Sequence, residues 1–165
     1  MKTLLIMRHA KSSWGDSAMP DHERPLNERG HRDAPRMGKL LRREGMVPQA
    51  IVASDAARAR ATAQAAAEAS GFEGEVQYNS LLYGAGPEAY RQVLAQLPEK
   101  LDSVMVIGHN PAAEELLEDL TGEDEHFPTA AIAQVELDIA QWGDWDEETE
   151  GRLINMWRPK EVKGD

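Results

Sequence analysis

Two histidines each follow a short apolar run, at the point where a buried strand should end. Arg8 and His9 directly follow residues 3–7, and His109 comes one glycine after residues 103–107. In an open α/β sheet, ligands bind beyond the carboxyl ends of the strands, so these side chains should face a ligand rather than the core. A cation and two imidazoles gathered there can bind an oxyanion and react with it. The sequence therefore predicts one chemical site on two strand ends.

A second arginine is expected at the same edge of the sheet. Residues 50–53 form another apolar run, and Arg58 follows it about one turn into the next helix. Guanidinium groups, imidazoles and the amides of a helix start are donors suited to a tetrahedral dianion. Ser12, in the polar loop after His9, and Asn110, where a helix begins, are further candidate substrate-binding residues. Together these residues predict a phosphoryl ligand, with no cofactor and no metal ion required.

The two histidines are predicted to have different roles. A neutral imidazole is a nucleophile when a backbone carbonyl keeps one ring nitrogen protonated and the other nitrogen faces phosphorus. His9, in a tight turn beside Arg8, fits that role, and His109 would then stabilise the phosphoryl oxygens with the arginines. Taken singly, His109 is equally well explained as a helix-start histidine, and Arg58 as a surface ion-pair partner. Their joint placement after three strands is what favours a site.

The elements that position these residues alternate between short apolar runs and amphipathic segments, which is typical of a mainly parallel α/β sheet. Strands are predicted at residues 3–7, 50–53, 75–78, 103–107, 132–138 and 152–157, the last two as a hairpin. Four helices are predicted: from the cap Asn27 to about Glu44, from a Ser54 or Asp55 cap to Gly71, from Gly86-Pro87 toward Leu97, and from Asn110-Pro111 toward Leu120. Pro35 predicts that the first helix is kinked or starts only after Asp33.

The composition sets outer limits on the function. A chain of 165 residues with 41% apolar residues is expected to form a single catalytic domain over residues 1–165. Its net charge of -11 argues against nucleic-acid and membrane partners. The absence of a signal-peptide core and of a long apolar run predicts a soluble, cytoplasmic protein, and a monomer is favoured. His22, His31 and His126 lack metal-ligand spacing and are expected at the surface.

Four segments together resemble the histidine phosphatase superfamily. They are Leu5 to Ala10, with its Arg-His pair, Arg24 to Gly30, Ser54 to Thr62 and Val106 to Pro111. The similarity extends to about Trp157 and is greatest to the small SixA-type phosphohistidine phosphatases. It implies a three-layer α/β/α sandwich with a mainly parallel central sheet, of the phosphoglycerate-mutase-like kind. It also implies that His9 is transiently phosphorylated, while Arg8, Arg58 and His109 form the phosphate pocket.

The chain departs from the family pattern at the general acid. Larger phosphomonoesterases of the superfamily have a carboxylate after the third strand, where this chain has residues 79–85, which contain no acid. Glu88 is the nearest candidate, and Asp16, Asp21 and Glu23 are others. A phosphoramidate depends less on an acid than an ester does, which favours phosphohistidine as the substrate.

Three functions remain open at this point. The leading one is a metal-independent phosphatase acting on a phosphorylated protein, for which a histidine phosphotransfer domain is one candidate partner. The short chain leaves little sequence for segments that would cover the site, which favours a protein side chain as substrate. The alternatives are a phosphatase for a small-molecule phosphate ester and a non-catalytic phosphate-binding regulatory module.

Overall fold

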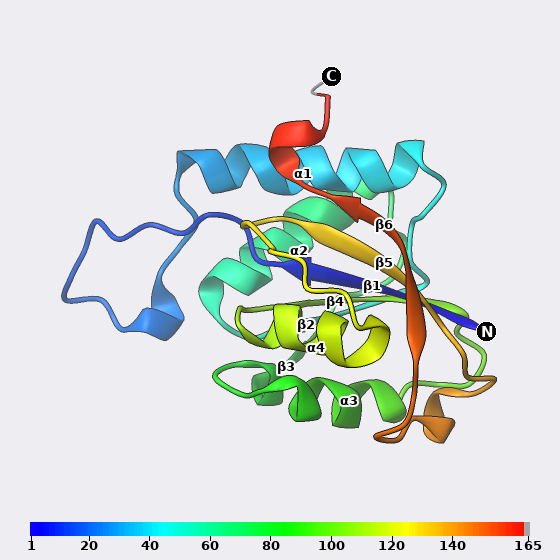
Figure 1. Cartoon of the computed structure of the whole chain (residues 1–165). Coiled ribbons are helices and arrows are strands. Elements are labelled where there is room, and N and C mark those ends of the chain that lie inside the picture. Colours follow the sequence, from blue (N-terminus) through cyan, green and yellow to red (C-terminus); the bar gives the residue numbers. More distant parts are fainter. Residues whose placement is uncertain (164–165) are drawn as a thin grey trace.

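A computed structural model of the chain describes residues 1–163, in which one six-stranded sheet lies between two layers of helices (Figure 1). The strand order is β3-β2-β4-β1-β5-β6. The strands are β1 (Lys2–Arg8), β2 (Ala50–Ser54), β3 (Gln77–Asn79), β4 (Ser103–Gly108), β5 (Ile132–Leu137) and β6 (Gly151–Trp157). The predicted mainly parallel α/β sandwich is confirmed, and the two last strands form the expected antiparallel pair.

The four helices are α1 (Glu28–Arg43), α2 (Ala57–Ser70), α3 (Pro87–Ala95) and α4 (Ala112–Thr121). Alternate side chains of the central strands point to opposite faces, so each face has its own core. Leu5 and Met7 pack in the core under α1 and α2, whereas Leu4 and Ile6 pack in the core under α3 and α4. The central strands are covered on both faces, which explains their nearly continuous apolar sequences. No helix within residues 1–163 is long and apolar enough to span a bilayer.

Strand register brings the predicted site residues to one edge of the sheet. β1 and β4 pair in parallel with Arg8 opposite Gly108, and β2 pairs in parallel with β4. The amide of His9 donates to the carbonyl of Gly108 at 2.9 Å, which joins the two strand ends. The long segment between β1 and α1 projects from this same edge, on the left of Figure 1. The carboxyl ends of three parallel strands therefore meet beside a long loop.

The helix starts differ in part from the sequence-based predictions. Asn27 caps α1 as expected, accepting from the amide of Gly30 at 2.9 Å, and this cap lets the helix begin ahead of Pro35. A start only after Asp33 was therefore wrong. A side-chain cap for α2 was also wrong: Ala56 occupies the cap position and no side chain caps the helix. Ser54 is the last residue of β2, and its hydroxyl contacts the Ala56 amide and His109.

Candidate functional site

His9 is held in a single ring orientation at the end of β1. Its Nδ1 lies 2.7 Å from the carbonyl oxygen of Ala10, and only 6% of the residue is exposed. A carbonyl can only accept, so Nδ1 bears the proton and Nε2 keeps a free electron pair. Burial, ahead of the neighbouring positive charges, lowers the pKa of His9 to about 3. His9 is therefore a neutral imidazole with Nε2 as its basic atom.

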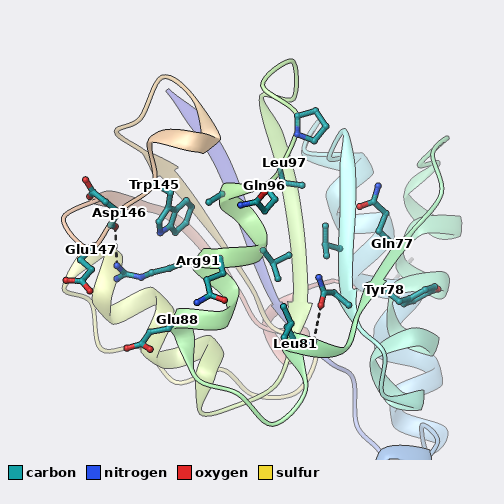
Figure 2. A pocket seen from close by; sticks show the side chains of 16 residues that line it. Gln77, Tyr78, Leu81, Glu88, Arg91, Gln96, Leu97, Trp145, Asp146 and Glu147 are labelled. Carbon is teal, nitrogen blue, oxygen red and sulfur yellow. Dashed lines mark hydrogen bonds between the residues drawn. The ribbon is translucent and has the colours of Figure 1, made fainter.

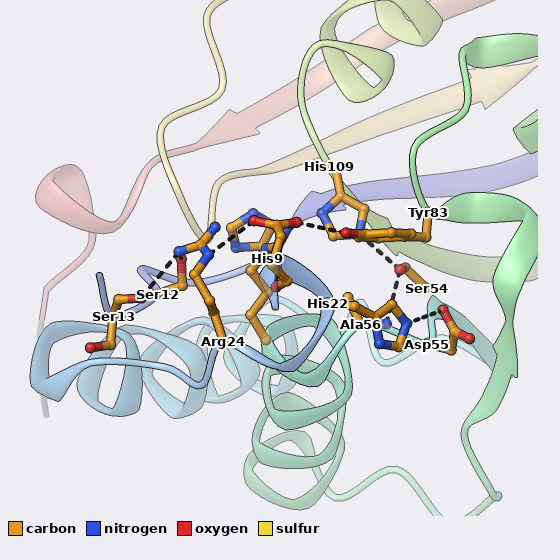
Figure 3. Close-up of polar contacts among 12 residues, drawn as sticks. His9, Ser12, Ser13, His22, Arg24, Ser54, Asp55, Ala56, Tyr83 and His109 are labelled. Atoms are coloured by element: carbon orange, nitrogen blue, oxygen red, sulfur yellow. Dashed lines mark hydrogen bonds and ion pairs between the residues drawn. The ribbon is translucent and has the colours of Figure 1, made fainter. Parts of the chain in front are cut away.

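His109 lies next to His9 at the end of β4, with 5.1 Å between the two ring centroids (Figure 3). Its Nε2 lies 2.8 Å from the hydroxyl oxygen of Ser54, and its Nδ1 is buried with no hydrogen-bond partner among residues 1–163. Burial, followed by the charge of Arg58, lowers the pKa of His109 to about 4. Ser54 thus orients the ring and leaves Nδ1 available for a ligand.

A tyrosine fixes the backbone at the end of β4. The buried hydroxyl oxygen of Tyr90 accepts from the amide of His109 at 3.1 Å, and the hydroxyl donates to the carbonyl of Leu82 at 3.2 Å. A Cβ at position 108 would collide with that hydroxyl, so Gly108 is required for this approach. The Gly-His pair therefore positions the second histidine through a backbone contact that a larger residue would break.

Arg58 reaches the site from the first turn of α2, as predicted, and is 6% exposed. Its Nη1 donates to the carbonyl oxygen of Asp21 at 2.7 Å, and its Nη2 donates to a carboxylate oxygen of the same residue at 3.0 Å. Its Nε is buried without a hydrogen-bond partner in the part of the chain that the structure describes. The Nε–H of Arg58 is thus a buried donor without a partner, while Nη1 and Nη2 each donate to the chain's own aspartate.

Arg24 is a site residue that the sequence prediction did not single out. It is 7% exposed, its Nε donates to the carboxylate of Asp21 at 3.0 Å, and its Nη1 donates to the hydroxyl of Ser12 at 2.7 Å. The ring of Trp14 covers its guanidinium at 3.6 Å. The hydroxyl of Ser12 thus anchors this arginine, and a phosphate contact by Ser12 stays a prediction. The segment that begins at Arg24 had been matched to the family, and that match was the signal available.

Arg8 and Asn110 converge on one loop carbonyl. Nη1 of Arg8 and Nδ2 of Asn110 donate to the carbonyl of Phe127 at 2.9 Å and 3.0 Å, respectively. Nδ2 of Asn110 also donates to Glu114 at 3.1 Å. Within residues 1–163, Nε of Arg8 is a buried donor without a partner. Arg8 therefore has a donor to offer, whereas a phosphate contact by Asn110 stays a prediction.

Glu88, the acid nominated from the sequence, lies in a different depression. It stands in the first turn of α3 and lines a cleft with Arg91, Leu81 and Trp145 (Figure 2). Neither histidine of the site is among the lining residues of that cleft. A role for Glu88 as proton donor stays a prediction, whereas the acid that does contact Arg58 is Asp21.

The low pKa values of His9 and His109 predict a pH-dependent stability. Both lie below the ordinary value of 6.5, so the unfolded chain binds more protons in the acidic range and stability is lost as the pH falls from about 6.5 toward about 4. We expect His9→Gln to reduce the slope of the unfolding free energy against pH by up to ~1.4 kcal/mol per pH unit in this window, measured by urea denaturation. The exposed His31 supplies the control, His31→Gln. Equal slopes in all three proteins would contradict the assignment.

Comparisons of sequence and of fold with known proteins identify similar proteins. Residues 4–82 match the family model described as Histidine phosphatase superfamily (branch 1). The provisionally named phosphohistidine phosphatase SixA from Agrobacterium tumefaciens is 32% identical and has a TM-score of 0.81, covering 96% of this chain and 98% of that one. A second structure, from Nakamurella multipartitia, is also provisionally named SixA. It is 29% identical and has a TM-score of 0.84, and the match covers 96% of this chain and 96% of that one. An uncharacterised protein of Mycobacterium tuberculosis is 33% identical, over 84% of this chain and 90% of its own length.

The family model thus covers residues 4–82, and the similarity to solved SixA-type structures covers 96% of the chain. The segments matched in the sequence supply the strand-end histidines and the arginine of α2, and the structure places all three at one sheet edge. The sequence match to a SixA structure and the shared fold extend well beyond these motifs. This chain belongs to the histidine phosphatase superfamily and is a SixA-like member of it.

Proposed function

We propose that this protein is a metal-independent phosphatase that removes phosphate from phosphohistidine on another protein, through a phosphohistidine intermediate on His9. The observation that supports this most is the bond from His9 Nδ1 to the Ala10 carbonyl at 2.7 Å, because it leaves Nε2 as a free nucleophile. Burial lowers the pKa of His9 to about 3, so the ring is neutral at neutral pH and the electron pair of Nε2 is available for attack.

The first step is attack of His9 on the phosphoryl group. The electron pair of Nε2 forms a bond to phosphorus, and the bond from phosphorus to the substrate's imidazole nitrogen breaks with its electrons on that nitrogen. The proton on Nδ1 stays hydrogen-bonded to the Ala10 carbonyl, which stabilises the positive ring that forms. The nucleophile is thus activated by orientation, without a separate base.

Positive charge stabilises the phosphoryl oxygens during transfer. Arg8 and Arg58 each offer a buried Nε donor that has no partner within residues 1–163, and both charges act on His9. The hydroxyl of Ser54 accepts from the amide of Ala56, so its own proton can go to Nε2 of His109, and Nδ1 of His109 then carries the ring's proton as a third donor. All three donors are arranged before the substrate arrives. Such fixed donors stabilise a phosphoryl transition state without reorganisation, which is the work a metal ion does in other phosphatases.

The second step is hydrolysis of the phosphoenzyme. Water adds to phosphorus, the bond from phosphorus to His9 Nε2 breaks, and that nitrogen recovers its electron pair. The water proton leaves to solvent or to the phosphate formed. The same donors stabilise both transition states, because the phosphoryl oxygens occupy the same positions in each.

The chemistry of the leaving group favours phosphohistidine over a phosphate ester as the substrate. A phosphohistidine ring that is protonated on its second nitrogen departs as neutral imidazole, whereas an alkoxide needs a proton as the bond breaks. The acid that touches the site, Asp21, is a poor donor, since the Tyr83 hydroxyl and two arginines hold the pKa of its carboxyl far below the usual range. The ionised state of Asp21 therefore matches a substrate that requires no acid.

Turnover of matched substrates tests this proposal. We expect kcat/KM for a phosphohistidine peptide to exceed that for the same peptide carrying phosphoserine by at least about 10²-fold. This is the factor by which ester hydrolysis slows when no general acid protonates the leaving group. A panel of small phosphate esters completes the comparison. A strong preference for one small ester would replace the proposal with the phosphomonoesterase alternative. Binding of phosphate without any turnover would replace it with the regulatory module.

A further inference from the structure

The carboxylate of Asp21 is bonded to cationic side chains that would suit an anionic ligand. One oxygen accepts from Arg24 Nε at 3.0 Å, and the other accepts from Arg58 Nη2 at 3.0 Å and from the Tyr83 hydroxyl at 2.7 Å. Two guanidinium groups are the kind of donor set that binds a phosphoryl group, and the phenol helps to hold the carboxylate against them. In the structure this set is bonded to a carboxylate of the chain itself.

The same interaction extends to the second histidine. The negative charge of Asp21 is among the charges that act on His109, so the carboxylate lies within electrostatic reach of that ring. A phosphoryl dianion on His9 Nε2 would share Arg58 with this carboxylate. Two anions bound to the same guanidinium lie close together and repel each other. Bound phosphate therefore has to displace the carboxylate or tolerate its repulsion.

We propose that Asp21 competes with phosphate for Arg24 and Arg58 and thereby sets the affinity of the site for its product. This inference rests on the proposed function, since it assumes that the phosphoryl group binds between Arg58 and the two histidines. Phosphate contacts shared by substrate and product would otherwise bind the product as tightly as the substrate, which slows turnover. A built-in carboxylate weakens that shared binding and promotes release of inorganic phosphate.

The chain permits a clean removal of the charge. The loop is fastened to Arg58 by a second bond, from Nη1 to the backbone carbonyl of Asp21 at 2.7 Å, which a side-chain substitution leaves in place. In Asp21→Asn, the amide oxygen can still accept from Tyr83. Glu23 belongs to the same short 3-10 turn, is exposed and has no ion pair in residues 1–163, so Glu23→Gln is a matched control.

Titration with inorganic phosphate, followed by calorimetry, tests the inference. The carboxylate is half exposed, with 49% of the side chain accessible, so solvent screens part of its charge. We therefore expect Asp21→Asn to bind phosphate roughly three- to tenfold more tightly than the natural chain, and Glu23→Gln to bind it equally. In turnover assays, phosphate should inhibit the Asp21 variant at correspondingly lower concentration.

A second variant keeps the test decisive if Asp21→Asn does not fold. Tyr83→Phe removes the hydroxyl that holds the carboxylate and leaves every charge in place, so we expect about twofold tighter phosphate binding. Unchanged or weaker phosphate binding in the folded variants would overturn the inference while the proposed function stands. An absence of phosphate binding in the natural chain and in every variant would overturn the proposed phosphate site and the inference with it.

Discussion

Replacing His9 by alanine is expected to abolish turnover, with a loss of at least about 10⁴-fold in kcat, because no other group can form the bond to phosphorus. His109 is not expected to substitute, because Nε2 accepts from Ser54 in the proposed arrangement, and Nδ1 then bears the proton and has no electron pair for attack. Single-turnover assays on a phosphohistidine peptide would measure the loss. Circular dichroism would show that the variant remains folded.

The control for this result is another histidine of the same chain. His31 lies on α1 and is exposed, so His31→Ala should retain the natural rate. A folded His9→Ala protein that kept substantial activity would contradict the mechanism at its first step. A comparable loss in both variants would instead indicate a general effect of histidine removal on the sample.

Arg58→Ala is expected to give the second largest loss, about 10²- to 10³-fold in kcat/KM, because it removes a buried, preorganised guanidinium beside His9. Arg58→Lys should recover only part of this loss. A lysine retains the charge but not the planar fork, and its ammonium cannot place one donor on the phosphoryl group and another on the Asp21 carbonyl in the same geometry. Steady-state kinetics on the phosphohistidine peptide would separate the three proteins.

Arg60 supplies the matched control two positions along α2. Its guanidinium stacks on the ring of Tyr78 at 4.1 Å and donates to the carbonyl of Asp55 at 2.9 Å, so its charge faces the outer side of the helix. Arg60→Ala should leave kcat/KM within about twofold of the natural value, as surface arginines contribute little. Equal losses in the two alanine variants would show that net charge, and not the position of Arg58, sets the rate.

The sequence predicted those parts of the site that regular structure positions. His9 and His109 were identified because apolar runs mark where strands end, and parallel strands end at one edge of a sheet. Arg58 followed from the third such strand and the helix after it. Each of these positions lies at the end of a strand or the start of a helix, and the periodicity of apolar residues in a short segment predicts those boundaries. The hairpin at the end of the chain was predicted from the same local patterns, whereas the strand order depends on pairing between distant segments and was not predicted from them.

The parts of the site that the sequence did not place depend on loops. Arg24 and Tyr83 were not singled out, and Asp21 was named only as one of several candidate acids. All three lie in or directly after short 3-10 turns, where no repeating pattern indicates which side chains meet. A phosphate contact by Ser12 stays a prediction, since a serine hydroxyl can bond a substrate as well as a neighbouring arginine. Only the folded loop shows that it accepts from Arg24. The cap predicted for α2 failed for a related reason, since Ser54 contacts His109 instead.

The most direct test of the central claim is chemical identification of the phosphoenzyme. The protein would be mixed with a phosphohistidine peptide, quenched in alkali within one turnover, digested and analysed by mass spectrometry and NMR. Because Nδ1 of His9 is bonded to the Ala10 carbonyl, we expect phosphate on Nε2 of His9, as an acid-labile adduct that is absent from His9→Ala. Turnover without any phosphoenzyme, or phosphate on His109 or on Nδ1 of His9, would contradict the account.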